Sequence, residues 1–229
     1  MAAPTYKDKG LAGLATSGTS TFFYYPTVAA NDLLFLCVAD FSMTQLNVDS
    51  TWTLKAKKTI NEKQNSIGGP QFNIYMYSKL ATGSESGTET ITRIGDTGLL
   101  CVLPYSFDGD NYIIIEDITT NSSITDDVSW NDVAVGGSER SLIAFLVNYN
   151  KTASITISSI SGYTMNANTQ FIGGGSFGYC SFQFNSKINV SSASAETSTN
   201  GSIDGWGTIH LSVYNATPSV TANRSFIVN

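Results

Sequence analysis

A possible serine nucleophile is the first candidate for chemistry in this chain. Residues Gly174 to Gly178 read GGSFG, which fits the G-x-S-x-G pattern, and Asp204 and His210 follow in the order of an α/β-hydrolase triad. An esterase-like reaction through Ser176 is one interpretation. A nucleophile elbow needs a helix after its serine, whereas YCSFQF follows here and is typical of a strand. The pattern therefore favours a loop, and we expect no catalytic residues and no enzyme.

Cofactor and metal motifs are incomplete. Gly173, Gly175 and Gly178 also match G-x-G-x-x-G, but no helical pattern follows that could complete a dinucleotide-binding unit. The chain has one histidine, so a metal site built from histidines is excluded. Asp108 and Asp110 could offer oxygen atoms to calcium, yet the 12-residue calcium loop is not completed and Asp-Gly suits a turn. We expect no cofactor and no metal, and these two aspartates are weak calcium candidates.

Aromatic side chains could instead bind a ligand or a partner. Trp52, Trp130 and Trp206 could form a platform on which sugars stack, and a glycine flanks Trp206 on each side. Since glycines cover little, we expect Trp206 to be the most exposed of them. In QFNIYMYSKL, Tyr75 and Tyr77 lie opposite the core face, as at an interface. The candidate ligand or interface contacts are Trp206, Trp130, Tyr75 and Tyr77.

Charge and hydropathy restrict the partners. The 229 residues carry a formal net charge of -6, and only 13% are charged, against about 25% in a typical domain. Nucleic-acid binding needs clustered Lys and Arg, so we expect no nucleic acid. No apolar run approaches the ~20 residues that span a bilayer, and the start of the sequence lacks a signal-peptide pattern, so we expect no membrane and no export. Three separated cysteines within apolar runs predict buried thiols.

The elements that must position these residues are strands. Apolar or alternating runs of four to ten residues recur along the chain, and no helical period is sustained. Two runs, LLFLCVA from Leu33 and LIAFLV from Leu142, are apolar on both faces. We expect them to be central strands that are covered on each side, or strands in a subunit contact. The fold class that follows is all-β, an antiparallel β-sandwich with jelly-roll-like character.

The strand pattern occurs twice. Four short segments recur in the same order at offsets of 108 to 111, which predicts two similar halves of about 109 residues. We place the halves at residues 1–125 and 126–229, within one compact domain. The matched pairs are LLFLCVA with LIAFLVN, WTL with YTM, SKL with SKI, and GLLCVLPY with GTIHLSVY.

The order of these segments resembles a group of virion proteins of tailed bacteriophages. The resemblance runs along the whole chain and is carried by Asn31–Leu36 (NDLLFL), Trp52–Leu54, Tyr75–Glu85 (YMYSKLATGSE), Tyr105–Gly109 (YSFDG), Gly137–Leu142 (GSERSL) and Ser161–Thr164 (SGYT). In that group the first segment usually reads Gly-Asp, the tryptophan follows a glycine, and the later segment reads Tyr-Arg-Gly. Asn31 and Ser106 depart from this pattern.

The resemblance implies a non-enzymatic β-sandwich in a phage particle. We therefore expect a multi-copy head decoration or tail accessory subunit, assembled in the host cytoplasm and located in the virion. Its expected partners are other virion proteins and copies of itself. An alternative is a carbohydrate-binding or receptor-binding module of the tail, with host surface polysaccharide as partner. That alternative predicts exposed aromatic side chains near Trp206.

Overall fold

The computed structural model describes residues 2–42, 45–60, 71–94, 97–108, 112–124, 127–150, 155, 158–173, 178–192, 195–199 and 205–216. Their regular elements are β-strands in antiparallel sheets, so the predicted all-β fold is confirmed. The described residues include no helix that could cross a bilayer.

The first half of the chain forms a six-stranded inner sheet and a three-stranded outer sheet. The inner sheet has the order β1-β9-β4-β7-β6, and β2 also pairs with β9; the outer sheet has the order β3-β8-β5. These strands are β1 (Thr5–Lys9), β2 (Gly13–Ser17), β3 (Ser20–Tyr24), β4 (Leu33–Asp40), β5 (Leu46–Asn47), β6 (Thr53–Ile60), β7 (Phe72–Leu80), β8 (Thr88–Arg93) and β9 (Thr97–Asp108).

The second half forms a five-stranded inner sheet of order β10-β16-β12-β14-β13 and an outer pair β11-β15. Its strands are β10 (Tyr112–Ser123), β11 (Asp127–Trp130), β12 (Arg140–Asn150), β13 (Thr164–Ile172), β14 (Tyr179–Val190), β15 (Glu196–Thr199) and β16 (Gly205–Ala216). In both halves the chain crosses repeatedly between the inner and the outer layer, as in a jelly roll.

The two inner sheets have the same strand order when each half is numbered along the chain. When β2, which lies off the main path of the first sheet, is left aside, the first strand lies beside the last, and then come the second, the fourth and the third of the inner strands. A small structural motif also recurs: the Asp8 carboxylate, just after a β-bulge, accepts the backbone N–H of Thr27 at 2.9 Å, and Asp117, also just after a bulge, accepts that of Ala134 at 2.7 Å. An internal duplication would produce both features, and it stays our interpretation of them.

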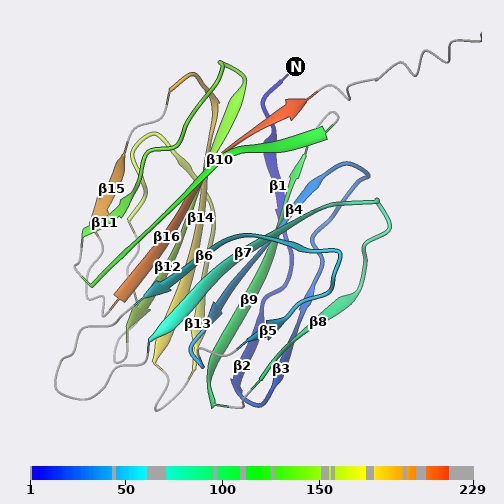
Figure 1. Ribbon diagram of the computed structural model, residues 1–229, viewed down its shortest axis with the longest axis vertical. Helices are drawn as coiled ribbons and strands as arrows, with labels where there is room; N and C mark the ends of the chain where they lie inside the picture. The colour runs from blue at the N-terminus through cyan, green and yellow to red at the C-terminus, as the bar shows by residue number, and fades with distance from the viewer. Residues whose placement is uncertain are drawn as a thin grey trace, which may run out of the picture.

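Four layers of strands are stacked with three apolar cores between them. The central core lies between the two inner sheets, and each inner sheet also packs against its own outer layer. In Figure 1 the sheet β3-β8-β5 lies on one side of the molecule and the pair β11-β15 on the opposite side. The sequence predicted one sandwich of two sheets, and the structure adds an outer layer to each half.

Strands β4 and β12 are the centre of this arrangement, which confirms that both are covered on each side. In β4, Phe35 and Cys37 face the central core while Leu34 and Leu36 face the outer layer, and all four are fully buried. Strand β12 alternates in the same way. Burying a large apolar side chain contributes about 1.5–3 kcal/mol. Because both faces of these two strands are buried, they contribute much of the stability of the core. The cysteines at 37, 101 and 180 are free and buried, as predicted.

Candidate functional site

The side chain of His210 is held by hydrogen bonds that have a structural role. Its side chain is buried in β16, where the Nδ1 atom lies 2.8 Å from the carbonyl oxygen of Asn131 and Nε2 lies 2.9 Å from the hydroxyl of Tyr163. Nδ1 must therefore donate to Asn131, and Nε2 accepts from Tyr163. Burial lowers the pKa of His210, so the neutral ring is favoured. Ser176 and Asp204 lie outside the described residues.

The calcium candidates are not brought together with other ligands in the described part of the chain. Asp108 ends β9 with an exposed side chain, and Asp110 lies outside the described residues. Within the described ranges, no three His, Cys, Asp or Glu side chains are grouped so that they could hold a metal ion.

The expectation that Trp206 is exposed is wrong. The residue is 1% exposed, and it packs in the core between the second inner sheet and its outer layer. The adjacent Gly207 faces the opposite side of β16, toward the central core, where a Cβ atom would lie 2.7 Å from Ile60 and 2.9 Å from Ile74. Gly207 therefore allows the two inner sheets to approach each other. Trp130 is also fully buried, and its Nε1–H donates to the carbonyl of Phe145 at 3.2 Å.

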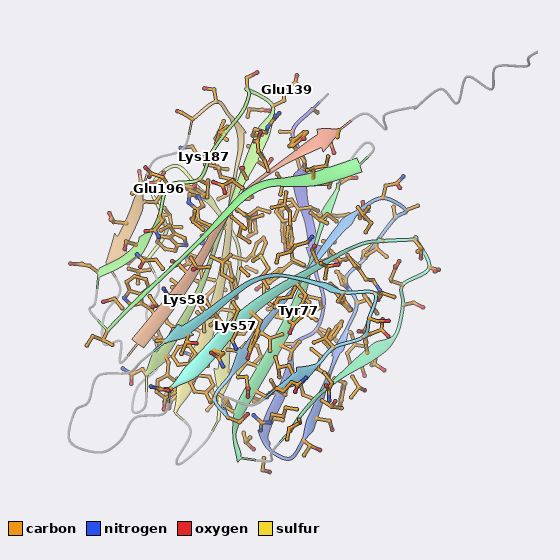
Figure 2. The ribbon with its side chains drawn as sticks, in the orientation of Figure 1. Lys57, Lys58, Tyr77, Glu139, Lys187 and Glu196 are labelled. Carbon is orange, nitrogen blue, oxygen red and sulfur yellow. The ribbon has the colours of Figure 1, made fainter. Side chains whose placement is uncertain are left out.

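Tyr75 and Tyr77 are not at a surface either. Both point away from the central core, as predicted, but the outer sheet covers that face and leaves them 5% and 9% exposed. Their rings stack at a centroid distance of 6.2 Å, and the ammonium of Lys57 lies 5.3 Å from the Tyr75 ring (Figure 2). The alternation in β7 predicts that these tyrosines face away from the central core. It does not predict that the outer sheet covers them, because that sheet is formed by other segments of the chain.

A cluster of aromatic and charged side chains joins β7, β8 and the neighbouring loops. The rings of Trp52 and Tyr25 stack, and the Lys79 ammonium lies 5.2 Å from the Trp52 ring and 2.9 Å from the Tyr25 hydroxyl. Trp52 Nε1–H donates to Glu89 at 2.8 Å, and the Tyr25 hydroxyl donates to the same carboxylate. Glu85 is 3.7 Å from the Lys79 ammonium. Every charged group of the cluster has a partner, so the cluster stabilises the packing of β7, β8 and the neighbouring loops.

The second half has a smaller version of this cluster. Lys187 lies 5.6 Å from the ring of Tyr163, which replaces Trp52 in the matched segments, and Glu196 lies close enough to interact electrostatically with Lys187 (Figure 2). Burial raises the pKa of both Tyr163 and Glu196. The sequence comparison matched SKL with SKI, but it did not indicate that each lysine would lie over an aromatic ring.

Two surface hollows, of about 390 and about 420 Å³, lie where the first strand of one half meets the inner sheet of the other half. Thr53, Ser78 and Leu80 line the first hollow together with β10, and Thr164, Ser186 and Ile188 line the second together with β1. Their linings combine hydroxyls and aliphatic side chains with lysines, Lys55 and Lys79 in the first hollow and Lys187 in the second. Neither lining includes a carboxylate, an imidazole or a thiol.

The most unusual surface feature is a group of exposed apolar side chains on β3 and at Leu11, between β1 and β2. We call this group the outer apolar patch: Leu11 is 64% exposed, Phe22 54% and Tyr24 42%. Leu11 and Tyr24 are joined by a β-bridge, and the rings of Phe22 and Tyr24 are in edge-to-face contact at 5.9 Å. A contiguous apolar surface of this kind marks an interaction site more often than scattered single residues do.

A row of threonines runs beside the two aromatic rings. Thr88 pairs across the strands with Tyr24, and Thr90 pairs with Phe22. Both threonines are exposed, and Thr92 continues the row. This face of the outer sheet therefore has one line of large rings next to one line of small side chains. None of these residues is charged.

The corresponding face of the second half is polar. In the pair β11-β15, Ser129 pairs with Thr197 as Phe22 pairs with Thr90 in the first half. Two residues further along, Asn131 follows Ser129 as Tyr24 follows Phe22. The buried residue between them is aromatic in both halves, Trp130 or Phe23.

Comparisons with known proteins do not add to this description, since no family model, curated protein or solved structure matches the chain.

Proposed function

We propose that this chain is a non-enzymatic structural protein of a tailed-phage virion, present in many copies as a head decoration or tail accessory subunit. The proposal rests on the resemblance of its segment order to that group of virion proteins. The observation in the structure that supports it most is the outer apolar patch, because a group of exposed apolar side chains without charge offers a contact for assembly.

The arrangement of the strands suits such a role. A virion protein must stay folded outside the cell, and four stacked layers with three apolar cores provide a large buried volume for a chain of this length. Repeated contacts between copies are the usual way in which such proteins form a shell or tail. The proposed partners are copies of the chain and other virion proteins, with assembly in the host cytoplasm.

Binding of host polysaccharide has less support. It required exposed aromatic side chains near Trp206, and both Trp206 and Trp130 are buried. We therefore keep it only as one outcome of the experiment below.

Immunogold electron microscopy of purified particles tests the proposal. An antibody raised against the chain is applied to particles of the phage that encodes it, purified by density gradient. Gold on the head supports a decoration subunit, and gold along the tail supports an accessory subunit. Absence of the chain from the particles, by gold and by immunoblot of dissociated virions, would overturn the proposal. Gold confined to the tail tip would favour the receptor-binding function.

A further inference from the structure

We propose that the outer apolar patch, together with the threonine row beside it, is the contact through which two copies of this chain associate about a two-fold axis. This inference rests on the proposed function, since it names the partner that a multi-copy subunit would meet first. The patch is exposed, complementary to itself in shape and free of charged side chains.

The fold itself does not require the exposed rings. The second half builds an equivalent outer layer with Ser129 and Asn131 at the positions of Phe22 and Tyr24, while it keeps an aromatic residue at the buried position between them. The aromatic residue is therefore needed on the inner side of this strand, but not on the outer side. Leaving Phe22 and Tyr24 about half exposed gives up much of the free energy of burying them, about 1.5–3 kcal/mol each when burial is complete.

The shape of this face is complementary to itself. Phe22 and Tyr24 form a ridge on β3, and Thr88 and Thr90 form a lower line on the adjacent β8. When a second copy is rotated by 180° about an axis that runs parallel to the strands and lies in the interface above the line between β3 and β8, its ridge faces the threonine line of the first copy. A two-fold contact requires this reciprocity, in which each copy uses the same patch. Sheets packed face to face in this way lie about 10 Å apart.

The absence of charge favours a second copy over a different macromolecule. The chain carries a net charge of -6, so most surfaces of two copies repel each other. The patch and the threonine row contain no ionisable group except the phenol of Tyr24, so they can be apposed without burying like charges. A polyanionic or polycationic partner would gain no electrostatic attraction at this surface.

Sedimentation velocity of the full-length protein over a dilution series tests the contact. The wild type should show a monomer–dimer equilibrium. The double variant Phe22→Ser/Tyr24→Asn, which introduces the two residues of the second half, should weaken dimerisation at least about tenfold, because a central aromatic contact is commonly worth this much or more. Ile172→Ser is the matched control, since Ile172 is 60% exposed but lies on β13 in the other half. It should leave the equilibrium unchanged.

Folding of the variants is checked separately by thermal unfolding. Both substituted side chains are substantially exposed, so the midpoint of the double variant should stay close to that of the wild type. A wild type that stays monomeric throughout the series would overturn the proposal. A double variant that is folded and dimerises as tightly as the wild type would also overturn it.

Cross-linking distinguishes the proposed geometry from other contacts through the same rings. A chain with Phe22→Cys and a differently tagged chain with Thr90→Cys are mixed and treated with a bifunctional maleimide whose spacer spans facing sheets; the three native cysteines are buried. Ridge-on-threonine packing should give mainly the mixed cross-link, because facing sheets lie about 10 Å apart, which is too far for a direct disulfide but within reach of such a reagent. Cross-linking of Phe22→Cys chains only to each other would contradict this geometry.

Failure of the two proposals can be separated. If gold labels the virion and the purified chain is monomeric, the structural role stands and the two-fold contact falls. If the chain dimerises through the patch and is absent from particles, the contact stands and the virion role falls. If the double variant is lost from particles although the wild type is monomeric alone, another virion protein covers the patch and the second-copy proposal is wrong.

Discussion

The space between inner and outer layers is filled differently in the two halves. In the first half, the positions of β4 that face the outer layer carry Leu34, Leu36 and Val38. The next such position is Asp40, which forms a buried ion pair with Arg93 at 3.0 Å. In the second half, the equivalent positions of β12 carry Leu142, Ala144 and Leu146 and then Asn148, whose side-chain atoms are buried without a hydrogen-bond partner in the described part of the chain. The same strand order therefore accepts either a paired charge or a neutral amide at this place.

At another pair of positions both halves have an ion pair, but the acidic and the basic residue are exchanged between the strands. Lys7, next to the bulge in β1, lies 2.7 Å from Asp32, and Glu116, next to the bulge in β10, lies 2.9 Å from Arg140. The backbone places two side chains opposite each other in each half. What the position requires is opposite charge, and not a particular residue on a particular strand.

The largest effect is expected from Asp40→Asn, which gives the first half the amide of the second. Arg93 is fully buried and also donates to the carbonyls of Gly18 and Gly98. Removing its counter-ion leaves a buried charge uncompensated, so the free energy of unfolding should fall by about 3–5 kcal/mol. Urea denaturation measures this. A loss below about 1 kcal/mol would show that the backbone carbonyls alone satisfy Arg93.

For Asn148→Leu we expect the free energy of unfolding to increase. The leucine has the same branched shape, with larger methyl groups, and it removes two buried polar atoms that have no partner among the described residues, so the protein should be stabilised by about 1 kcal/mol. The same denaturation experiment measures it, with Asp40→Leu as the matched change in the first half, where a large loss is expected. Destabilisation by Asn148→Leu would show that the amide is held by a bound water or another group.

The exchanged ion pairs should differ in strength because they differ in burial. Asp32 is 1% exposed and loses the ammonium of Lys7 in Lys7→Ala, which should cost about 1.5–3 kcal/mol. The pair of Glu116 and Arg140 is more exposed, so Glu116→Ala should cost about 1 kcal/mol or less. Equal losses in thermal or urea unfolding would mean that burial does not set the difference. Added salt should weaken only the second pair appreciably.

The smallest expected effect is a dependence of stability on pH through His210. Burial lowers the pKa of the folded-state imidazole below the value of about 6.5 in an unfolded chain. The unfolded state therefore binds the proton more readily, and the contribution of the neutral ring is present above pH 6.5 and decreases as the pH falls below it. Unfolding free energies measured between pH 5 and pH 8, for the wild type and for His210→Gln, should differ in slope on the acid side. Parallel curves would contradict this prediction.

The sequence predicted the parts of the fold that depend on alternation along one strand. The apolar runs of β4 and β12 gave two central strands, and the buried face of β7 was placed correctly. The burial of Trp206, Tyr75 and Tyr77 was missed, because it depends on layers formed by segments distant in the sequence. The outer apolar patch was missed for a related reason: in STFFY of β3 only the position of the sheet separates the buried Phe23 from the exposed Phe22.

By itself, the sequence determined that this chain folds into antiparallel strands and that it has few charged residues, with a net charge of -6. Both follow from residue types and their period, because side chains alternate across a strand whatever it packs against. Only the tertiary structure decided which faces are covered, which charges meet and which aromatic side chains reach the surface. These properties depend on contacts between strands far apart in the chain, and a shift of one residue in strand register would exchange the buried face for the exposed one.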